Sequence, residues 1–352
     1  MPEGLERSRL RSRVLVLIVV VVVAAALVTL LPGLASLRDR LGDARPGWLA
    51  IGAALKLLSG VAYVVVFRAV FCRRMSWRVS TQIGFAELGA NAVLPTGGAG
   101  GLALGAWALR RGGMSTQHIA KRTVAFFLLT SVPNVVAVII LGFGLAFGVV
   151  PGKVSLALAL IPAGLAVTAI AGTLLAGRLA AAGEQRRVRR AEGDPSAVSR
   201  TTPVLGAIAR GVDEAVSLLR RHDIQLVAGA VGYLAFDVMV LWATFHAFGS
   251  SPSLAILWLA YLIGELGGLL PLPGGIGGVD GGLIGTLVLY GVALTPATAA
   301  VLGYRAIALW VPSVVGVIAF LSLRRTLSRE SHAIADCEPG ETVDVGLGSV
   351  VA

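Results

Sequence analysis

The sequence predicts an all-α polytopic membrane protein with about six full spans and two re-entrant helical hairpins that form an inverted repeat. The first observation is composition, because 56% of the 352 residues are hydrophobic and 14% are charged. The second is that several apolar runs reach the length of about 20 helical residues that crosses a bilayer core. The third is a glycine-rich segment that occurs twice. In lipid an α-helix satisfies its own backbone polar groups, so we expect each apolar run to be helical.

Six of the apolar runs fit full spans. They cover residues 14–31, 47–71, 123–150, 154–177, 224–248 and 297–323. The first run follows a basic segment, residues 1–13, and no small-residue cleavage site follows it cleanly. We therefore interpret it as a retained helix rather than a signal peptide. Residues 14–325 form the predicted membrane domain, and residues 326–352 form a polar tail that we expect to be disordered.

The glycine-rich segment appears in two related copies. Residues 265–285 read ELGGLLPLPGGIGGVDGGLIG, and residues 87–101 read ELGANAVLPTGGAGG. Both copies open on Glu-Leu-Gly, continue to a Leu-Pro pair and then carry two Gly-Gly pairs. Two matching runs in one chain indicate a duplicated unit with glycines at its centre.

Each copy lies in a unit of unusual length. The first unit, residues 79–109, is too long for one span and too short for two. Its centre, residues 95–98, combines Pro and Gly and would break a helix. The second unit, residues 254–294, is broken in the same way at residues 271–275. We therefore predict two half-length helices in each unit, which meet inside the bilayer as a re-entrant hairpin.

The helices that follow the hairpins also match. VPNVVAVI at residues 132–139 and VPSVVGVI at residues 311–318 are identical at six of eight positions. The repeats therefore cover about residues 47–150 and 224–323. The helix between them, residues 154–177, would invert the second copy. Inverted repeats with broken helices near the bilayer midplane are typical of secondary transporters.

The distribution of positive charge supports this topology. If each hairpin returns to the side on which it starts, one face holds 23 of the 30 Lys and Arg residues. The segments on that face are residues 1–13, 72–78, 110–122, 178–223 and the C-terminal tail. Since cytoplasmic loops carry an excess of Lys and Arg, both termini are predicted to be cytoplasmic. The excess of Arg over Lys, 27 to 3, is associated with GC-rich bacterial genomes, so we expect a bacterial cell membrane.

The long polar connection, residues 178–223, leaves two interpretations open. It contains the basic run Arg186–Arg190, and its second half, from Pro203, has apolar residues at helical spacing. Such an amphipathic helix can lie on an anionic membrane surface. Alternatively the segment is a solvated connector with an ordinary positive-inside bias.

Apart from Arg68, which is near a helix end and is interpreted as interfacial, six charged residues lie inside the predicted membrane segments, where each costs about 2.5–3.5 kcal/mol on insertion scales. They are Lys56, Glu87, Asp237, Glu265, Asp280 and Arg305. Since four are acids and two are bases, they cannot all neutralise one another. An excess acid must be protonated, hydrated, or paired with a ligand or ion.

Each acid has a functional and a structural interpretation. Glu87 and Glu265 occupy equivalent positions and could couple transport to protons or cations, or could simply hydrogen-bond the hairpin backbone. Asp280 could act in a site, or could cap a helix N-terminus. Asp237 could tune or couple the site together with these acids.

Each base also has a functional and a structural interpretation. Arg305 could bind a phosphate or carboxylate headgroup through its planar fork, or could pair with Asp237, Glu265 or Asp280. Lys56 could assist Arg305, or could snorkel toward the membrane surface.

The glycines have binding and packing interpretations. The predicted substrate-binding glycines at the hairpin centres are Gly97, Gly98, Gly274 and Gly275. The half-helices that begin there would present positive N-termini to the site. Gly277, Gly281 and Gly285 recur every four residues, a spacing that favours close helix packing.

Several other classes of function have no support in the sequence. The glycine runs do not fit GxGxxG, and the four histidines show no metal-ligand spacing. No nucleophile and base pair is evident, so we predict no catalytic residue, no metal, no cofactor and no enzymatic activity. The basic residues lie in loops between apolar runs, which fits membrane topology rather than a nucleic-acid partner.

Together, ELGGLLPLPGGIGGVDGG and the weaker upstream ELGANAVLPTGGAGG resemble the membrane domain of the lysylphosphatidylglycerol synthase family, the flippase-like domain. The resemblance covers roughly residues 14–325. It implies movement of a charged phospholipid between leaflets, whereas synthesis in that family belongs to a separate soluble domain that this sequence does not include. The family motif commonly has Glu where this chain has Asp280, so the carboxylate is retained with a shorter reach.

The predicted function is therefore translocation of an anionic or otherwise charged phospholipid, or of a lipid-linked substrate. One alternative is a non-transporting scaffold that holds a lipid- or glycan-modifying enzyme through the basic connection. Another is a secondary transporter of a soluble substrate. The expected partners are membrane phospholipids and, in the scaffold alternative, a lipid-modifying enzyme.

Overall fold

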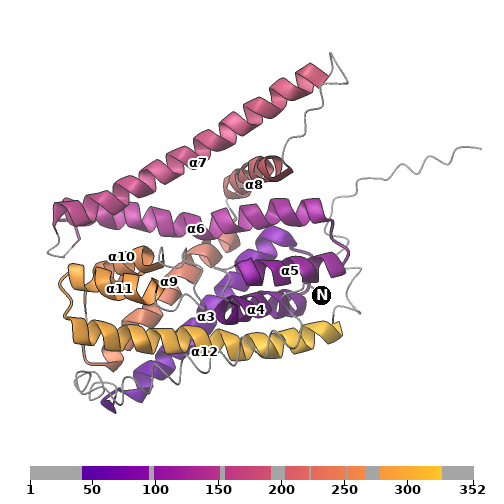
Figure 1. Ribbon diagram of the computed structural model, residues 1–352. Coiled ribbons are helices and arrows are strands. Elements are labelled where there is room, and N and C mark those ends of the chain that lie inside the picture. The colour runs from indigo at the N-terminus through magenta and orange to yellow at the C-terminus, as the bar shows by residue number, and fades with distance from the viewer. Residues whose placement is uncertain are drawn as a thin grey trace, which may run out of the picture.

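The computed structural model describes residues 42–94, 99–150, 155–191, 203–221, 223–250, 252–265 and 278–326, and the elements in these ranges are helices. Figure 1 shows them with the labels α3 to α12. They are α3 (Pro46–Phe71), α4 (Trp77–Val93), α5 (Ala99–Arg111), α6 (Thr116–Ala146), α7 (Leu156–Ala191), α8 (Pro203–Arg220), α9 (Ile224–Ala247), α10 (Leu254–Glu265), α11 (Gly278–Leu289) and α12 (Leu294–Thr326). The predicted N-terminal segment, first span and tail lie outside the described residues.

Five of the described helices are long and apolar enough to cross a bilayer. These stretches are Pro46–Phe71, Thr116–Ala146, Leu156–Thr173, Ile224–Ala247 and Leu294–Leu323. Each corresponds to a predicted span, and the remaining predicted span, residues 14–31, is not described. The described part of the chain is therefore all-helical and is that of a multi-pass membrane protein.

The helices form two similar groups of four. In each group a long helix is followed by two short helices and another long one, as α3 to α6 and then α9 to α12. In Figure 1, α6 and α12 lie on opposite sides of the bundle, with the short helices between them. Contacts cross between the groups, because α3 packs against α9, α4 against α12, and α10 against α6. The duplication read from the sequence thus has a counterpart in the order of the helices.

The first helices of the two groups run in opposite directions. At one end the backbone N–H of Arg45 donates to the carbonyl oxygen of Ala247 at 3.0 Å. Toward the other end, Val70 of α3 and Leu226 of α9 share one buried cluster. The start of α3 therefore meets the end of α9, and the end of α3 meets the start of α9.

The unit between α3 and α6 folds back on itself. Within it, the side chain of Asn91 on α4 accepts from the backbone N–H of Gly101 on α5 at 2.7 Å. After it, Arg122 on α6 donates to the carbonyl oxygen of Val70 at the end of α3, at 2.8 Å. The predicted breaks at residues 95–98 and 271–275 lie outside the described residues, but the two short helices predicted on either side of each break are present.

Two helix boundaries differ most from the prediction, and the other boundaries of the described spans agree to within about four residues. Helix α6 begins at Thr116 rather than at residue 123, because the side chain of Ser115 accepts from the backbone N–H of His118 and caps the helix there. Helix α7 continues to Ala191, well past residue 177 and through the basic run. The residues after 177 are mainly Ala, Arg, Glu and Gln, which are strong helix formers although they are not apolar. Hydropathy indicates where the apolar span ends, at about residue 177, whereas helix α7 itself ends at Ala191.

The predicted amphipathic helix is present as α8, and part of its described apolar face is covered, whereas Leu219 is 38% exposed. Buried Val212, Ala215 and Leu218 lie on a helix that packs against α6. Glu214 of α8 is held by Lys121 at 2.7 Å and by Arg122 at 3.1 Å. These described apolar side chains are therefore covered by protein, which favours the connector interpretation over a helix lying on the membrane surface.

The ion pairs of Glu214 predict a pH-dependent contribution to stability. Burial alone would raise the pKa of Glu214, but the hydrogen bond from Lys121 and the charge of Arg122 outweigh it and hold the pKa below 4.5. A lowered pKa means that the contribution is complete at neutral pH and disappears as the pH falls through the folded-state value. Wild type should melt above Glu214→Gln at pH 7, by at most about 2–4 °C, and the difference should shrink below about pH 4.5. Thermal unfolding in detergent checks this, and a difference that is constant with pH contradicts it.

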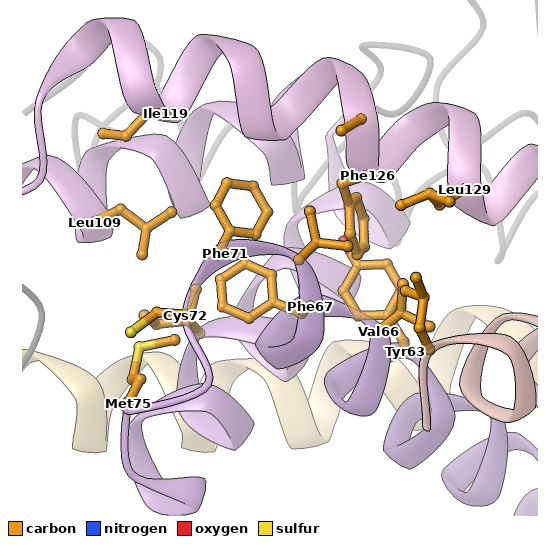
Figure 2. Close-up of a cluster of buried hydrophobic side chains, with 14 of the residues drawn as sticks. Tyr63, Val66, Phe67, Phe71, Cys72, Met75, Leu109, Ile119, Phe126 and Leu129 are labelled. Atoms are coloured by element: carbon orange, nitrogen blue, oxygen red, sulfur yellow. The ribbon is translucent and has the colours of Figure 1, made fainter. Parts of the chain in front are cut away.

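Aromatic side chains fill the space between α3, α5 and α6. Figure 2 shows Phe67 and Phe71 of α3 close to Phe126 of α6. The ring centroids of Phe67 and Phe71 are 4.7 Å apart, and those of Phe71 and Phe126 are 5.9 Å apart. This aromatic cluster packs α6 against α3.

Glycines permit the close approach of α4 and α12. The glycines predicted to favour close packing lie instead on and before α11. A Cβ atom on Gly316 would lie 2.6 Å from the Cα of Gly89 and 2.7 Å from the carbonyl oxygen of Phe85. By contrast, a Cβ atom on Gly281 or Gly285 would meet nothing within 4 Å. The prediction that this four-residue spacing packs α11 closely is therefore wrong at those two positions. The helix uses the neighbouring Gly282 instead, which approaches Gly264 of α10.

Candidate functional site

Five of the six charged residues predicted inside the membrane gather in one cluster, which we call the charge cluster. Its members are Lys56, Asp237, Glu265, Asp280 and Arg305, from α3, α9, α10, α11 and α12. Glu265 interacts electrostatically with the four others. Residues that are far apart in the sequence therefore meet in one place. Glu87, the sixth residue, lies elsewhere.

Lys56 and Asp237 form a buried ion pair between the two groups of helices. The Nζ atom of Lys56 donates to Oδ1 of Asp237 at 2.6 Å, and the two side chains are 11% and 7% exposed. The hydroxyl of Tyr261 donates to the other oxygen, Oδ2, at 2.9 Å. Lys56 therefore does not snorkel toward the surface in this conformation, because its charge is compensated inside the bundle.

Arg305 and Asp280 form the second pair. The Nε atom of Arg305 donates to Oδ1 of Asp280 at 2.6 Å, and both side chains are largely buried. Asp280 is the third residue of α11, in the first helical turn, where an anion is also favoured by the helix dipole. The pairing that the sequence left open is thus present. A headgroup that binds Arg305 would have to compete with Asp280 or bind beside it.

Glu265 has a different environment from the two paired acids. It is the last residue of α10, and its side chain is accessible rather than buried. Among the described residues it forms no ion pair, so the cluster holds three acids and two bases. If all five groups are ionised, the cluster carries one uncompensated negative charge, and Glu265 is the accessible group that carries it.

Tyrosines surround the cluster, and the sequence analysis missed them. Tyr233, Tyr261 and Tyr304 each interact electrostatically with Asp237 and Glu265. The ring centroids of Tyr261 and Tyr304 are 6.1 Å apart in an edge-to-face arrangement. Membrane tyrosines are usually enriched at the two interfaces. Their position well inside apolar runs, such as Tyr233 in α9, was the signal that could have identified them.

Glu87 is sealed inside the first short-helix unit. Its residue is 2% exposed, and its Oε2 accepts from the hydroxyl of Tyr63 on α3 at 2.7 Å. Its Oε1 lies against the backbone of α5, because a Cβ atom on Gly105 would be only 1.4 Å from that oxygen. Glu87 and Glu265 are equivalent in sequence but differ in burial and in charged neighbours.

The four glycines predicted to bind substrate lie outside the described residues. They are Gly97, Gly98, Gly274 and Gly275. At the beginning of α5, the backbone N–H of Gly101 donates a hydrogen bond to the side-chain oxygen of Asn91. This N–H group is therefore not free to bind a substrate in this conformation. Within the described ranges no group of three or more His, Cys, Asp or Glu side chains is placed to hold a metal ion. What the arrangement offers chemically is two ion pairs, an accessible carboxylate and tyrosine hydroxyls inside a membrane domain.

The chain is similar in sequence to a known family of membrane proteins. Residues 15–316 match the family described as the lysylphosphatidylglycerol synthase TM region. A UPF0104 membrane protein from Methanothermobacter thermautotrophicus is 30% identical over 105 residues. That alignment covers 29% of this chain and 31% of the relative, so the chain aligns with less than a third of the relative's length.

Proposed function

Since this chain belongs to the family of the lysylphosphatidylglycerol synthase TM region, which it matches over residues 15–316, we propose that it is a non-enzymatic lipid translocase. It moves an anionic or otherwise charged phospholipid, or a lipid-linked substrate, between the leaflets of the cell membrane. The charge cluster is the observation that carries this proposal. Charged side chains inside membrane segments are expensive, and they usually mark a substrate or ion pathway.

The lengths of α5, α10 and α11 support re-entrant hairpins, the second of which contributes Glu265 and Asp280 to this cluster. At 1.5 Å per residue, the 12 residues of α10 or of α11 extend about 18 Å, which is shorter than a hydrocarbon core of about 30 Å. The 13 residues of α5 extend about 20 Å. Helices of this length end inside the bilayer unless the membrane thins. A broken helix is tolerated there when it lines a protein-enclosed site.

Contacts at the ends of the first unit support its return to the side on which it starts. Arg73, before α4, pairs with Asp223, and Lys121, after α5, pairs with Glu214. Both acids belong to the segment that contains α8 and leads into α9. Three of the basic segments assigned to the cytoplasmic face therefore meet at one end of the bundle, as the positive-inside rule requires. The antiparallel arrangement of α3 and α9 supports the inverted repeat in the same way.

Arg305 is the residue that would hold the headgroup, with Lys56 nearby. A guanidinium presents a planar fork to phosphate or carboxylate oxygens, so an anionic headgroup would displace or share the Asp280 carboxylate. Asp237 would keep Lys56 in place. The accessible Glu265 would repel an anionic headgroup, or attract the positive part of a headgroup that carries both charges.

The test is movement of labelled lipids across vesicles that contain the purified protein, with a panel of anionic, zwitterionic and cationic headgroups. Since a hydrogen bond to a charged group contributes about 1.5–3 kcal/mol, Arg305→Ala should slow transport roughly 10- to 100-fold. Gly285→Ala is the matched control, because nothing lies within 4 Å of its added Cβ atom. Unchanged transport in a folded Arg305→Ala protein would remove Arg305 from the site. An absence of movement for every lipid would reject the translocase.

The scaffold function remains a second candidate because of α7. This helix continues beyond its membrane-spanning part, and Figure 1 shows it leaving the bundle at an angle. The basic run Arg186–Arg190 lies near its end and is suited to an acidic partner enzyme. Deleting this run separates the two functions. Loss of partner binding with intact lipid movement supports transport as the activity of the membrane domain, whereas partner binding by a protein that moves no lipid supports the scaffold.

A further inference from the structure

Glu87 is a buried ionisable group that the proposed headgroup site does not use. It lies on α4, away from the charge cluster, and its residue is 2% exposed. A carboxyl group in such a position needs hydrogen-bond partners or a compensating charge. The only side chain that hydrogen-bonds to it among the described residues is Tyr63, which is itself 5% exposed.

No described cation compensates Glu87. The helices packed against α4 are α3, α5 and α12. The titratable side chains described on these three helices are Lys56, Tyr63, Arg68, Arg110, Arg111, Tyr304, Arg305 and Arg325. Of these, Tyr63 is the electrostatic partner of Glu87. The two bases deep in the bundle, Lys56 and Arg305, are already paired with Asp237 and Asp280.

An unpaired buried carboxylate is far more costly than a buried carboxylic acid. We infer that the sealed Glu87 carries a proton in this conformation. Its Oε2 accepts the Tyr63 hydrogen bond, so Oε1, next to Gly105, is the oxygen that bears the proton. Apolar side chains surround this position. Figure 2 shows Tyr63 beside Phe126, and their ring centroids are 5.1 Å apart.

The second copy of the motif shows the same position in an accessible arrangement. Glu265, the equivalent of Glu87, is exposed and surrounded by the charged groups of the charge cluster. One motif thus provides both a sealed and an open environment for its glutamate. If the first unit took up the arrangement of the second, Glu87 would become accessible and could release its proton.

A path of tyrosines connects Glu87 with the charge cluster. The ring centroids of Tyr63 and Tyr233 are 5.4 Å apart across the interface between α3 and α9. Tyr233 in turn interacts electrostatically with Asp237, the partner of Lys56. These contacts give a change in the charge of Glu87 a route toward the groups that would hold the headgroup.

We propose that Glu87 is a proton-binding site that couples lipid movement to the proton gradient, and that Tyr63 positions its carboxyl group. This proposal rests on the proposed lipid translocation. In the step itself, the O–H bond of the Glu87 carboxylic acid breaks, the proton passes to water when the unit opens, and the carboxylate regains a proton before the unit closes. No oxidant, reductant or further reactant takes part.

The first experiment measures lipid asymmetry in vesicles with and without an imposed pH gradient. One proton per lipid allows an asymmetry of up to about tenfold for each pH unit in wild type. In Glu87→Gln, which mimics the protonated acid, the ratio between the two conditions should fall to about one. Asp213→Asn, an exposed acid on α8, is the matched control and should keep the wild-type ratio. Gradient-dependent asymmetry in Glu87→Gln, or lipid movement in wild type that ignores the gradient, would overturn the proposal.

The second experiment does not depend on transport. Infrared difference spectroscopy of wild type against Glu87→Gln at neutral pH isolates the carbonyl stretch of this one carboxyl group. A protonated carboxylic acid band is expected, and Tyr63→Phe should shift it by removing the hydrogen bond to Oε2. A carboxylate band in its place would reject the proton site even if lipid movement is present. A protonated band in a protein that moves no lipid would reject the translocase and leave the proton site standing.

Discussion

Replacing Lys56 with Met is expected to destabilise the protein by about 3–5 kcal/mol, because Asp237 is left as an uncompensated charge inside the bundle. The pair is 2.6 Å long, and both side chains are largely buried. Tyr261 donates only one hydrogen bond to Asp237 and cannot replace the ammonium group. The free energy of unfolding in detergent measures the loss. The contact also joins α3 to α9, so the protein should become more sensitive to proteolysis between the two groups of helices.

Two variants give this prediction its controls. Lys56→Met combined with Asp237→Asn removes both charges and keeps an acceptor for Tyr261, so it should recover most of the lost stability. Lys121→Met removes a lysine from the more exposed pair with Glu214, where a surface ion pair contributes about 0–1 kcal/mol. Equal losses in Lys56→Met and Lys121→Met would show that burial of the Lys56–Asp237 pair has no energetic consequence.

Gly316→Ala is expected to cost about 1–3 kcal/mol, since a methyl group at this position must push two helices apart. The atoms it would meet, at 2.6 and 2.7 Å, belong to the backbone of α4 and cannot rotate away. The damage falls on the packing of the first short-helix unit against α12. The chemical denaturation midpoint measures it. In the same variant, a cysteine introduced on α4 should become easier to label.

Gly285→Ala provides the matched control for this substitution. Nothing lies within 4 Å of its added methyl group, and alanine is a better helix former than glycine by about 1 kcal/mol. This variant should be neutral or slightly stabilised. A loss in Gly285→Ala that equals the loss in Gly316→Ala would mean that helix propensity or a general loss of glycine flexibility, and not the contact with α4, determines the result.

Much of the fold could be predicted because its signals are local. Apolar length identified the spans, and Pro with Gly marked the breaks between short helices. Ser76 caps α4 and Asp223 caps α9 close to their predicted starts, whereas the cap at Ser115 was missed and α6 was predicted to begin too late. The end of α7 was predicted too early, because hydropathy reports burial in lipid, whereas helix formation beyond the bilayer depends on the residues' own propensities.

The candidate site could be predicted only in part, because its geometry depends on contacts between distant segments. The cost of charge in lipid identified the six charged residues as candidates for a site. It did not show that Lys56 pairs with Asp237, or that Arg305 pairs with Asp280. Tyr63 and Tyr261 were missed, since a tyrosine in an apolar run has no local mark of its partner. The glycine spacing on α11 gave a wrong contact, because small residues permit close packing without specifying which face a neighbour takes.

The contact between Gly89 and Gly316 also has a consequence for biosynthesis. The two glycines are more than 200 residues apart, so α4 enters the membrane long before α12 exists. At roughly 5–20 residues per second, the delay is on the order of 10–50 s. During that time the first short-helix unit lacks the protein surface that α12 later provides along α4. The insertion machinery or lipid must hold the unit until the last span of the second group is made, so truncated chains that end before α12 should be rapid substrates for membrane quality control.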